Sequence, residues 1–293
     1  MSRGWRRALW WSWSLAARRA AQAYVAGTEL SDALRVCTTL SRQQVTATIC
    51  PWNGDGDPPR GVADAYIAAL DGLAHTHPHC TTSIKAPALG YSTDLLQEIL
   101  EVARRGGIGV HFDALSPDTA DPTFTLLEGA VAQWGGRALG CTLPGRWRRS
   151  LADGDRAIAL GLRVRVVKGQ WRESAAPEPD WRAGFQAVVE HLAGRARHVA
   201  VATHDATLAR AALRLLLAAG TPCELQLLYG LPIRNGLRLA RELGVPVRIY
   251  VPYGTAWLPY CLSQVRSNPR IIWWTVRDAV LGRSFRLPAE ASP

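Results

Sequence analysis

The sequence predicts one α/β domain folded as a (β/α)8 barrel with an N-terminal helical extension, and three observations support this fold class. Eight short apolar or β-branched runs recur along the chain, each followed by a segment with helical spacing of its apolar residues. The chain has 293 residues, which suits one barrel of about 250 residues with additions at its ends. It has no long linker, so we expect a single domain over 1–293, with a helical arm over about 1–43 and the barrel over about 44–270.

Each expected strand has the composition of a parallel strand buried on both faces. Several helices expected between them begin after Ser, Asp or Thr and end at Gly, as at 93–105 and 206–220. An open doubly wound sheet is the rival architecture, but residues 50–57 do not form a GxGxxG turn that leads into a helix. The expected strands are 44–50, 81–89, 107–115, 138–143, 162–169, 198–205, 223–230 and 245–254.

Composition narrows the class of function. The net charge is +10, but the arginines are spread along the chain without a basic tail, so nucleic acid is not an expected partner. The six cysteines form no CxxC pair and most lie in apolar runs, which indicates buried free thiols in a reducing compartment. The apolar N-terminal run ALWWSWSLAA is too short to span a bilayer, and we interpret it as an amphipathic helix. We expect a cytoplasmic protein, and a peripheral contact with the inner membrane face stays open.

Polar residues gather at the carboxyl ends of the expected strands, where active sites of such barrels form. Lys85 and Lys168 are the only lysines in an arginine-rich chain, and both fall at such ends, so we expect both to point into the mouth of the barrel. Capping or rim packing would explain any one of these residues, but six converging strand ends favour a polar, net-positive site. The strand-end residues are Lys85, His111, Asp113, Arg165, Lys168, Thr203, His204, Asp205, Gln226, Tyr229, Tyr250 and Tyr253.

Six motifs follow one another along these strands, namely SIKAPALG, GVHFDA, RVRVVKG with Trp171 after it, VATHD, CELQLLYG and RIYVPYGTAWLPY. Their order and spacing resemble those of the proline dehydrogenase family of FAD-dependent barrels. The earlier stretch AYVAGTELSDAL is similar to the helix that precedes the barrel in that family. The resemblance covers about residues 20–270.

The resemblance implies an FAD site at the rim. Arg165 would lie near the flavin N5 and pyrimidine edge and stabilise negative charge on the reduced ring. Lys168 and Gly169 would hold the phosphate and ribose region, since an ammonium acts as a point charge and glycine lets the backbone approach. Gln170 takes a third position of that run, where the family often has a small residue. The other implied cofactor contacts are Ala114 to the flavin, and Thr203 and His204 to the pyrophosphate or adenosine side.

The resemblance also implies a small-molecule amine or imino-acid substrate, from which a hydride leaves a carbon next to nitrogen. Asp113 would act beside the substrate together with Arg165, Lys85 would lie at the substrate end of the pocket, and Tyr250 would form its wall. The site must hold the C–H bond over the flavin and keep the amine unprotonated. Family members usually pass the electrons to a quinone, and no metal is expected.

The sequence departs from the family where a pair of arginines grips the proline carboxylate. Ser263 and Gln264 occupy those two positions, and neither can replace a guanidinium fork. Losing two such contacts costs roughly 1.5–3 kcal/mol apiece. Arg266 lies about one helical turn beyond Ser263 and would reach part of the same face, unless it is a solvated surface arginine. A second departure is at 142–144, where the family has a flavin-contacting glutamine.

Several functions remain open on this evidence. The first is a flavin-dependent amine or imino-acid dehydrogenase whose substrate is not free L-proline. A genuine L-proline dehydrogenase that makes pyrroline-5-carboxylate is the second, with Lys85 and Arg266 holding the carboxylate. A non-catalytic barrel is the third, and unrelated barrel chemistry, such as a Schiff base on Lys168, is the fourth.

Two further stretches have ordinary interpretations. His75, His77 and His79 alternate before the second strand and could bind a metal, but we interpret them as part of a surface loop at the opposite end from the expected site. Residues 52–59 are too short for an EF-hand loop, and we interpret them as a loop at the mouth that could act as a lid.

Overall fold

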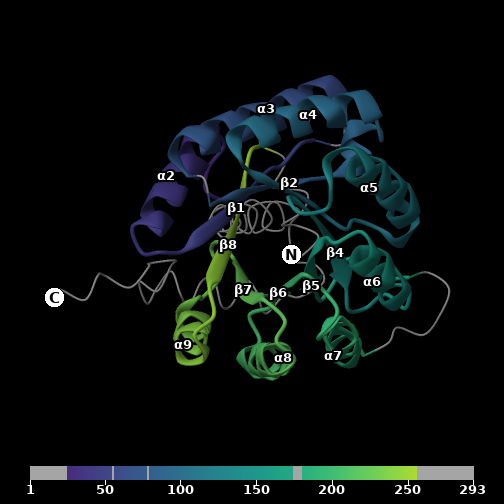
Figure 1. Cartoon of the computed structure of the whole chain (residues 1–293). Coiled ribbons are helices and arrows are strands. Elements are labelled where there is room, and N and C mark those ends of the chain that lie inside the picture. Colours follow the sequence, from purple (N-terminus) through teal and green to yellow (C-terminus); the bar gives the residue numbers. More distant parts are fainter. Residues whose placement is uncertain (1–24, 55, 78, 174–179, 256–293) are drawn as a thin grey trace, which may run out of the picture.

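Eight parallel strands close a barrel in chain order, and β8 pairs with β1 to complete the ring (Figure 1). The structure is a computed structural model that describes residues 25–54, 56–77, 79–173 and 180–255. It confirms the expected fold class. The strands are β1 (Thr46–Pro51), β2 (Thr81–Ile84), β3 (Gly109–Phe112), β4 (Leu139–Pro144), β5 (Arg163–Val167), β6 (His198–Ala202), β7 (Cys223–Leu228) and β8 (Val247–Tyr253).

Helices surround the barrel in a single outer layer (Figure 1). Helix α2 (Leu30–Ser41), which precedes the first strand, packs on β1, β8 and α3 and so fills the place in this layer beside β8. The apolar N-terminal run lies outside the described residues. The other described helices are α3 (Pro59–Thr76), the 3₁₀ turn η1 (Ala86–Leu89), α4 (Thr93–Gly106), the 3₁₀ turn η2 (Pro117–Thr119), α5 (Ala120–Trp134), α6 (Ser150–Ala159), α7 (Trp181–Leu192), α8 (Ala206–Ala218) and α9 (Arg234–Leu243).

Local signals account for where several helices begin and end. The Ser92 hydroxyl accepts a hydrogen bond from Leu95 N at the start of α4, and the Asp205 carboxylate accepts from the first turn of α8. Gly107 and Gly244 end α4 and α9 in the left-handed conformation that glycine adopts without strain. The second strand is shorter than expected because Pro87 and its neighbours form η1 directly after it.

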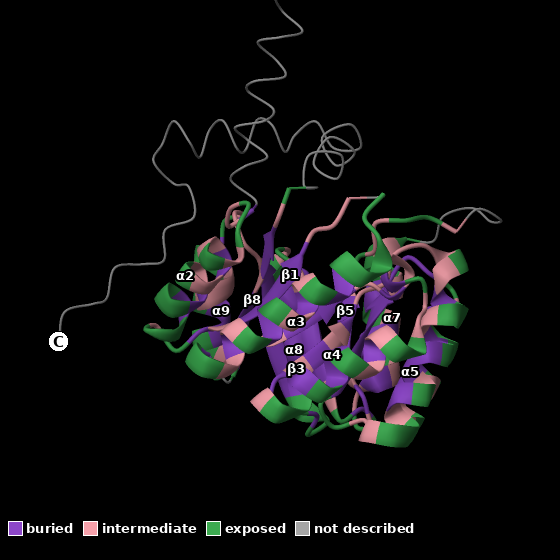
Figure 2. Cartoon of the chain, turned by 90° about the horizontal axis from the view of Figure 1, so that it is seen from above, coloured by how far each residue is buried: buried purple, intermediate pink, exposed green. Residues whose placement is uncertain are grey.

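The two faces of the barrel strands differ sharply in polarity, which corrects the expectation of apolar burial on both faces. Residues that point outward, such as Val164 and Val166 on β5, are buried under the helices and form the apolar core. Figure 2 shows the barrel strands as largely buried, inside helices that carry exposed residues. The neighbouring residues Arg163 and Arg165 point inward and meet polar side chains from other strands. The polar residues that face the barrel interior or its upper rim are Thr46, Thr48, Cys50, Thr81, Ser83, Lys85, His111, Asp113, Thr142, Arg163, Arg165, His198, Glu224, Gln226, Arg248 and Tyr250.

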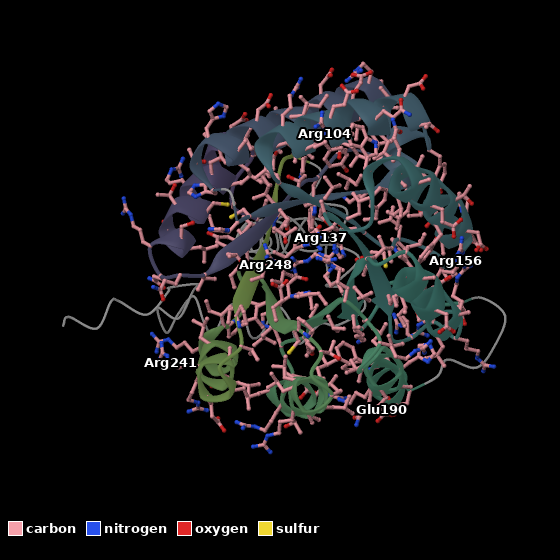
Figure 3. The ribbon with its side chains drawn as sticks, in the orientation of Figure 1. Arg104, Arg137, Arg156, Glu190, Arg241 and Arg248 are labelled. Atoms are coloured by element: carbon pink, nitrogen blue, oxygen red, sulfur yellow. The ribbon has the colours of Figure 1, made fainter. Side chains whose placement is uncertain are left out.

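The lower half of this interior holds a charge cluster, defined here as the floor cluster of Glu224, Arg248, Arg163 and His198. Glu224 and Arg248 are buried, whereas Arg163 and His198 are partly exposed. Arg248 Nε donates to Glu224 Oε1 at 2.8 Å, and Arg163 Nη2 lies 3.6 Å from Glu224 Oε2. In Figure 3 Arg248 lies near the barrel axis, whereas Arg156 and Arg241 lie out on the helices. Burial acts to raise the pKa of Glu224, but Arg248 together with the other positive neighbours outweighs burial, so the pKa is lowered overall and the carboxylate stays ionised.

The histidine triplet is not the surface loop that the sequence suggested. His75 lies in the last turn of α3, and His77 is buried, with its ring nitrogens 3.2 Å from the hydroxyls of Thr38 and Ser41 on α2. His77 therefore ties α3 to α2, and its burial lowers its pKa. Among the described residues, no group of three or more His, Cys, Asp or Glu is arranged to hold a metal ion.

The cysteines of the described part confirm the expectation of buried thiols. All five are unpaired, and each is buried. None of the described helices combines the length and the apolarity needed to cross a bilayer. The five cysteines are Cys37, Cys50, Cys80, Cys141 and Cys223.

Candidate active site

An ion pair between Asp113 and Arg165 lies at the centre of the upper barrel. Asp113 follows β3 directly, and Arg165 points inward from β5 on the far side of β4. Arg165 Nη2 donates to Asp113 Oδ1, and both side chains are almost fully buried, at 6% and 12% exposure. Ser83 Oγ on β2 donates to the same carboxylate oxygen at 2.5 Å. Sequence reasoning named Asp113 and Arg165 together, and the structure brings them into contact.

Thr142 on β4 holds the other side of the guanidinium. Its hydroxyl oxygen accepts from Arg165 Nε at 3.1 Å and from Nη2 at 2.9 Å, and it lies 3.1 Å from His111 Nε2. Burial and the nearby Arg165 charge lower the pKa of His111 well below its usual value, so this imidazole is neutral at pH 7. Thr142 stands in the stretch where the family pattern expects a glutamine, and here it orients Arg165.

Tyr250 and Cys50 complete the surroundings of the carboxylate from the β8 and β1 side. Tyr250 donates its hydroxyl hydrogen to Asp113 Oδ2 at 2.7 Å, and its ring centroid lies 5.1 Å from Arg165 Cζ. Cys50 Sγ lies 3.8 Å from the same Oδ2. Burial, and then the negative charge of Asp113, raise the pKa of Tyr250 well above its usual value, and burial raises the pKa of Cys50 to about 11. Both groups therefore remain protonated donors at pH 7.

Lys85 lies at the mouth, as expected, on the inward-facing position that follows β2. Its Nζ sits 5.7 Å from the centroid of the Trp52 ring, and its backbone N–H donates to the buried Tyr66 hydroxyl at 3.0 Å. Trp52 begins the loop after β1 and is fixed by a 2.7 Å hydrogen bond from its backbone N–H to Tyr253 O. An ammonium and an indole thus line the same edge of the mouth, next to the Asp113 cluster.

Lys168 has a different orientation from the one that the sequence suggested. It lies on the same side of β5 as the outward-pointing Val164 and Val166, and its Nζ sits 4.9 Å from the centroid of Trp181 at the start of α7. The side chain is exposed at the outer rim and does not point into the mouth. Gly169 follows with φ of +89°, a conformation that glycine adopts freely, and turns the chain into Gln170.

Thr203, His204 and Asp205 form the rim after β6. Thr203 Oγ1 accepts from Asp205 N at 3.1 Å, and Asp205 forms an ion pair with Arg182. His204 Nε2 accepts from Leu228 N at 2.9 Å, and its Nδ1 donates to a backbone carbonyl at 3.3 Å, so the ring is neutral and joins the ends of β6 and β7. Because both ring nitrogens bind the protein itself, His204 offers a ligand its exposed edge and ring face.

A small, partly open hollow lies beside the ion pair, between the ends of β3 and β4 and helix α5. Asp113, Ala114 and Thr142 line its inner end, and Phe124 of α5 and Trp147 lie in its wall. Ala114, the expected flavin contact, borders this hollow. Ser263, Gln264 and Arg266 lie outside the described residues. Their relation to the substrate carboxylate stays a prediction from the sequence.

Sequence reasoning missed Ser83 and Cys50 as members of the site. Both lie on inward-facing positions near the carboxyl ends of β2 and β1, the same relation that Asp113 and Arg165 have to their strands. Counting alternate residues back from Lys85 would have identified Ser83. Apart from this alternation, nothing in the sequence marked Ser83 or Cys50 as a site residue.

Comparison with known proteins bears on this arrangement. No family model matches the chain. Proline dehydrogenase 1 of Bacillus subtilis (strain 168) is 27% identical over 268 residues, covering 86% of this chain and 88% of the relative. Proline dehydrogenase of Deinococcus radiodurans is 27% identical over 291 residues, covering 92% and 91%. The resemblance to the proline dehydrogenase family is confirmed.

Solved structures show the same fold in longer proteins. Proline utilization A (PutA) of Bdellovibrio bacteriovorus, inactivated by N-propargylglycine, aligns with a TM-score of 0.74 at 16% identity over 85% of this chain. PutA of Corynebacterium freiburgense aligns with a TM-score of 0.70 at 17% identity over 93% of this chain. The chain spans about a third of the length of these PutA proteins, at 32% and 34%. At these identities the likeness concerns the fold.

Proposed function

We propose that this chain is a flavin-dependent dehydrogenase that oxidises the CH–NH group of an amine or imino-acid substrate, with FAD as the cofactor. The observation that carries the proposal is the buried Asp113–Arg165 pair, held directly below the mouth by donors from β1, β2 and β8 and by a hydroxyl acceptor on β4. A guanidinium fixed in this way is suited to stabilise negative charge that develops above it. The curated relatives at 27% identity are named proline dehydrogenases, which supports the same chemistry.

The residues present fit an FAD that spans the β3 to β6 side of the rim. Arg165 supplies a fixed positive charge below the mouth, and Lys168 supplies a second one at the outer rim on the same strand. Gly169 adopts its positive φ without strain, and Pro144 and Arg146 fill the side on which a Cβ would stand, so a ligand would approach from the other side. The first turn of α8 is a weaker anion site, because Asp205 already accepts from Thr207 N and Leu208 N. FAD would bring the hydride-accepting ring to this mouth.

The side chains around Asp113 would bind and orient the substrate. Lys85 offers a positive charge and Trp52 an aromatic face at one edge, and Tyr250 forms the wall that closes the β8 side. A neutral amine is required, because an ammonium has no lone pair to assist loss of hydride from the adjacent carbon. The Asp113 carboxylate, already bound by Arg165, Ser83 and Tyr250, contributes position and local charge beside that amine.

The finer proposal concerns the substrate, and it rests on Ser263 and Gln264. Without a guanidinium pair there, free L-proline should bind poorly, and an ester, an amide or an uncharged cyclic secondary amine fits better. The alternative is a genuine L-proline dehydrogenase that uses Lys85 and Arg266 for the carboxylate. We propose a quinone as the electron acceptor, following the usage of the family.

Anaerobic absorbance titration of the FAD-loaded protein tests both levels of the proposal. L-proline, its methyl ester, prolinamide and pyrrolidine are added in turn, and bleaching of the flavin band is recorded. We expect bleaching by at least one derivative and at least about a hundredfold weaker half-saturation for free proline than for that derivative. Ser263→Arg with Gln264→Arg should improve the response to proline. Arg266→Gln tests the alternative, since it should weaken the response to proline only if Arg266 holds the carboxylate.

Two results would count against the proposal at different levels. Failure of the purified or reconstituted protein to hold FAD removes the flavoprotein function itself. Efficient bleaching by free L-proline in the unaltered chain removes only the substrate proposal and favours the alternative with Lys85 and Arg266.

A further inference from the structure

The loop after β4 is fastened to the rim segment after β5 by hydrogen bonds that continue beyond the sheet. Gly145 N donates to Val167 O at 2.7 Å, and Arg146 N donates to Lys168 O at 3.2 Å. The strand pairing of β4 and β5 ends at Pro144 and Val167, so these bonds lie past the last paired residues. The segment held in this way, defined here as the rim strip of residues 168–171, is the one that carries the expected phosphate contacts.

Two side chains extend this attachment to the far end of the rim strip. Arg146 Nη1 donates to Gln170 O at 2.8 Å, and Trp147 Nε1 donates to Trp171 O at 2.8 Å. Both side chains are buried, at 8% exposure for Arg146 and 4% for Trp147. Burial makes each donor costly to leave unmatched, so the two carbonyls of the strip are held in fixed positions.

The shape of the rim strip also depends on Arg146. A Cβ atom at position 169 would lie 3.0 Å from Arg146 Cγ and 2.6 Å from Pro144 Cβ, so the arginine stem packs directly beneath the Gly169 backbone. Glycine at 169 therefore serves the packing of Arg146 as well as the positive φ. The stem supports the strip from below while the guanidinium holds its Gln170 end.

We propose that Arg146 is a positioning residue that presets the rim strip for the phosphate-bearing half of the cofactor, an inference that rests on the proposed FAD function. Trp147 acts with it at the Trp171 end. A strip that is already fixed loses less conformational freedom when the ligand binds, which raises affinity without a new ligand contact. Arg146 also adds a positive charge beneath the strip, on the side opposite the solvent-exposed Lys168.

The test compares four single variants in the full-length protein. Arg146→Met keeps most of the volume and removes the donors, Arg146→Lys keeps the charge and one donor group, and Trp147→Phe removes the Nε1 donor together with part of the buried ring. Arg148→Met is the matched control, because Arg148 is the exposed neighbour in the same loop. Two properties are measured in each: the Kd for FAD of the apoprotein by flavin fluorescence, and the rate of tryptic cleavage after Lys168 and Arg172 by mass spectrometry.

We expect Arg146→Met to raise the Kd for FAD about tenfold and to speed cleavage after Arg172 by a similar factor, with Arg148→Met unchanged in both. Arg146→Lys should recover part of the affinity. The tryptophan variant should show a smaller change in the same direction, and it keeps the test decisive if Arg146→Met does not fold.

A folded Arg146→Met protein whose Kd for FAD lies within about twofold of the wild-type value would overturn the inference, as would unchanged cleavage in both loop variants. If wild-type protein holds no FAD, the proposed function fails. The cleavage rates would still show whether Arg146 and Trp147 hold the strip.

Discussion

The barrel contains two buried arginine–carboxylate pairs, one near the mouth and one in the floor cluster, and they differ in what surrounds the carboxylate. Asp113 meets one arginine and the neutral donors Ser83, Tyr250 and Cys50. Glu224 faces two arginines and the uncharged His198. The upper pair is therefore balanced in charge, whereas the floor cluster keeps a surplus of positive charge.

The comparison shows that the position of an arginine–carboxylate pair along the strands decides its role. Arg163 and Arg165 lie two residues apart on β5 and both point inward, yet only Arg165 lies under the open mouth. Buried charges are costly unless they are paired, so both clusters must be satisfied for the barrel to fold. Only the upper one lies at the carboxyl ends of the strands, where active sites of this fold form. We therefore assign stability to the floor cluster and chemistry to the mouth.

The largest expected effect is on stability, from Glu224→Gln. This substitution leaves the buried Arg248 and the partly exposed Arg163 without a counter-charge, and it should lower the free energy of unfolding by about 3–5 kcal/mol. Urea denaturation at pH 7 measures the change. Below the midpoint of unfolding, the rate of flavin reduction should stay within about threefold of wild type, because the floor does not border the mouth. A large loss of rate with normal stability would reverse the two assignments.

Asp113→Asn is the matched substitution in the mouth, and its main effect should be on rate. The amide keeps the shape but loses the negative charge beside the amine, so flavin reduction should slow by about two orders of magnitude. Rapid mixing under anaerobic conditions measures it. The free energy of unfolding should fall less than in Glu224→Gln, since one arginine rather than two loses its counter-charge. Equal rates in Asp113→Asn and wild type would remove Asp113 from the chemistry.

The smallest expected effect is the acid sensitivity of the floor cluster. Burial, only partly offset by Glu224, lowers the pKa of His198 to about 4. The unfolded chain then binds more protons than the folded one below about pH 6.5, so stability is complete above that pH and falls as pH drops toward 4. His198 alone should account for a loss of about 2 kcal/mol between pH 7 and pH 5, and the lowered pKa values of His111 and His204 add to it. His198→Asn should flatten this slope, and an equally steep slope in that variant would show that other groups cause it.

Much of the fold could be predicted from the sequence because each strand run is bounded by helix caps and glycines. All eight runs became strands, although 81–89 stopped at Ile84, where Pro87 and its neighbours form a 3₁₀ turn. The polar inner face was harder to foresee. It depends on which alternate residues point inward, and a one-residue shift in register exchanges the two faces of a strand.

The sequence predicted the site residues well where a charged residue follows a strand. It predicted them less well where membership in the site depends on the direction of the side chain. Asp113, Arg165 and Tyr250 were named and do meet. Lys168 was expected in the mouth, but it lies outward over Trp181, three residues along the strand from Arg165. The attachment of Arg146 to Gln170 O joins two loops and leaves no periodic signal in the sequence.

The most direct test of the account is anaerobic flavin reduction by one secondary-amine substrate in three FAD-saturated proteins: wild type, Asp113→Asn and Glu224→Gln. The account predicts that the flavin band bleaches at similar rates in wild type and Glu224→Gln, and about a hundredfold more slowly in Asp113→Asn. If FAD is bound but no secondary amine bleaches it, or if Glu224→Gln rather than Asp113→Asn abolishes bleaching, the mouth of the barrel is not the site of the chemistry.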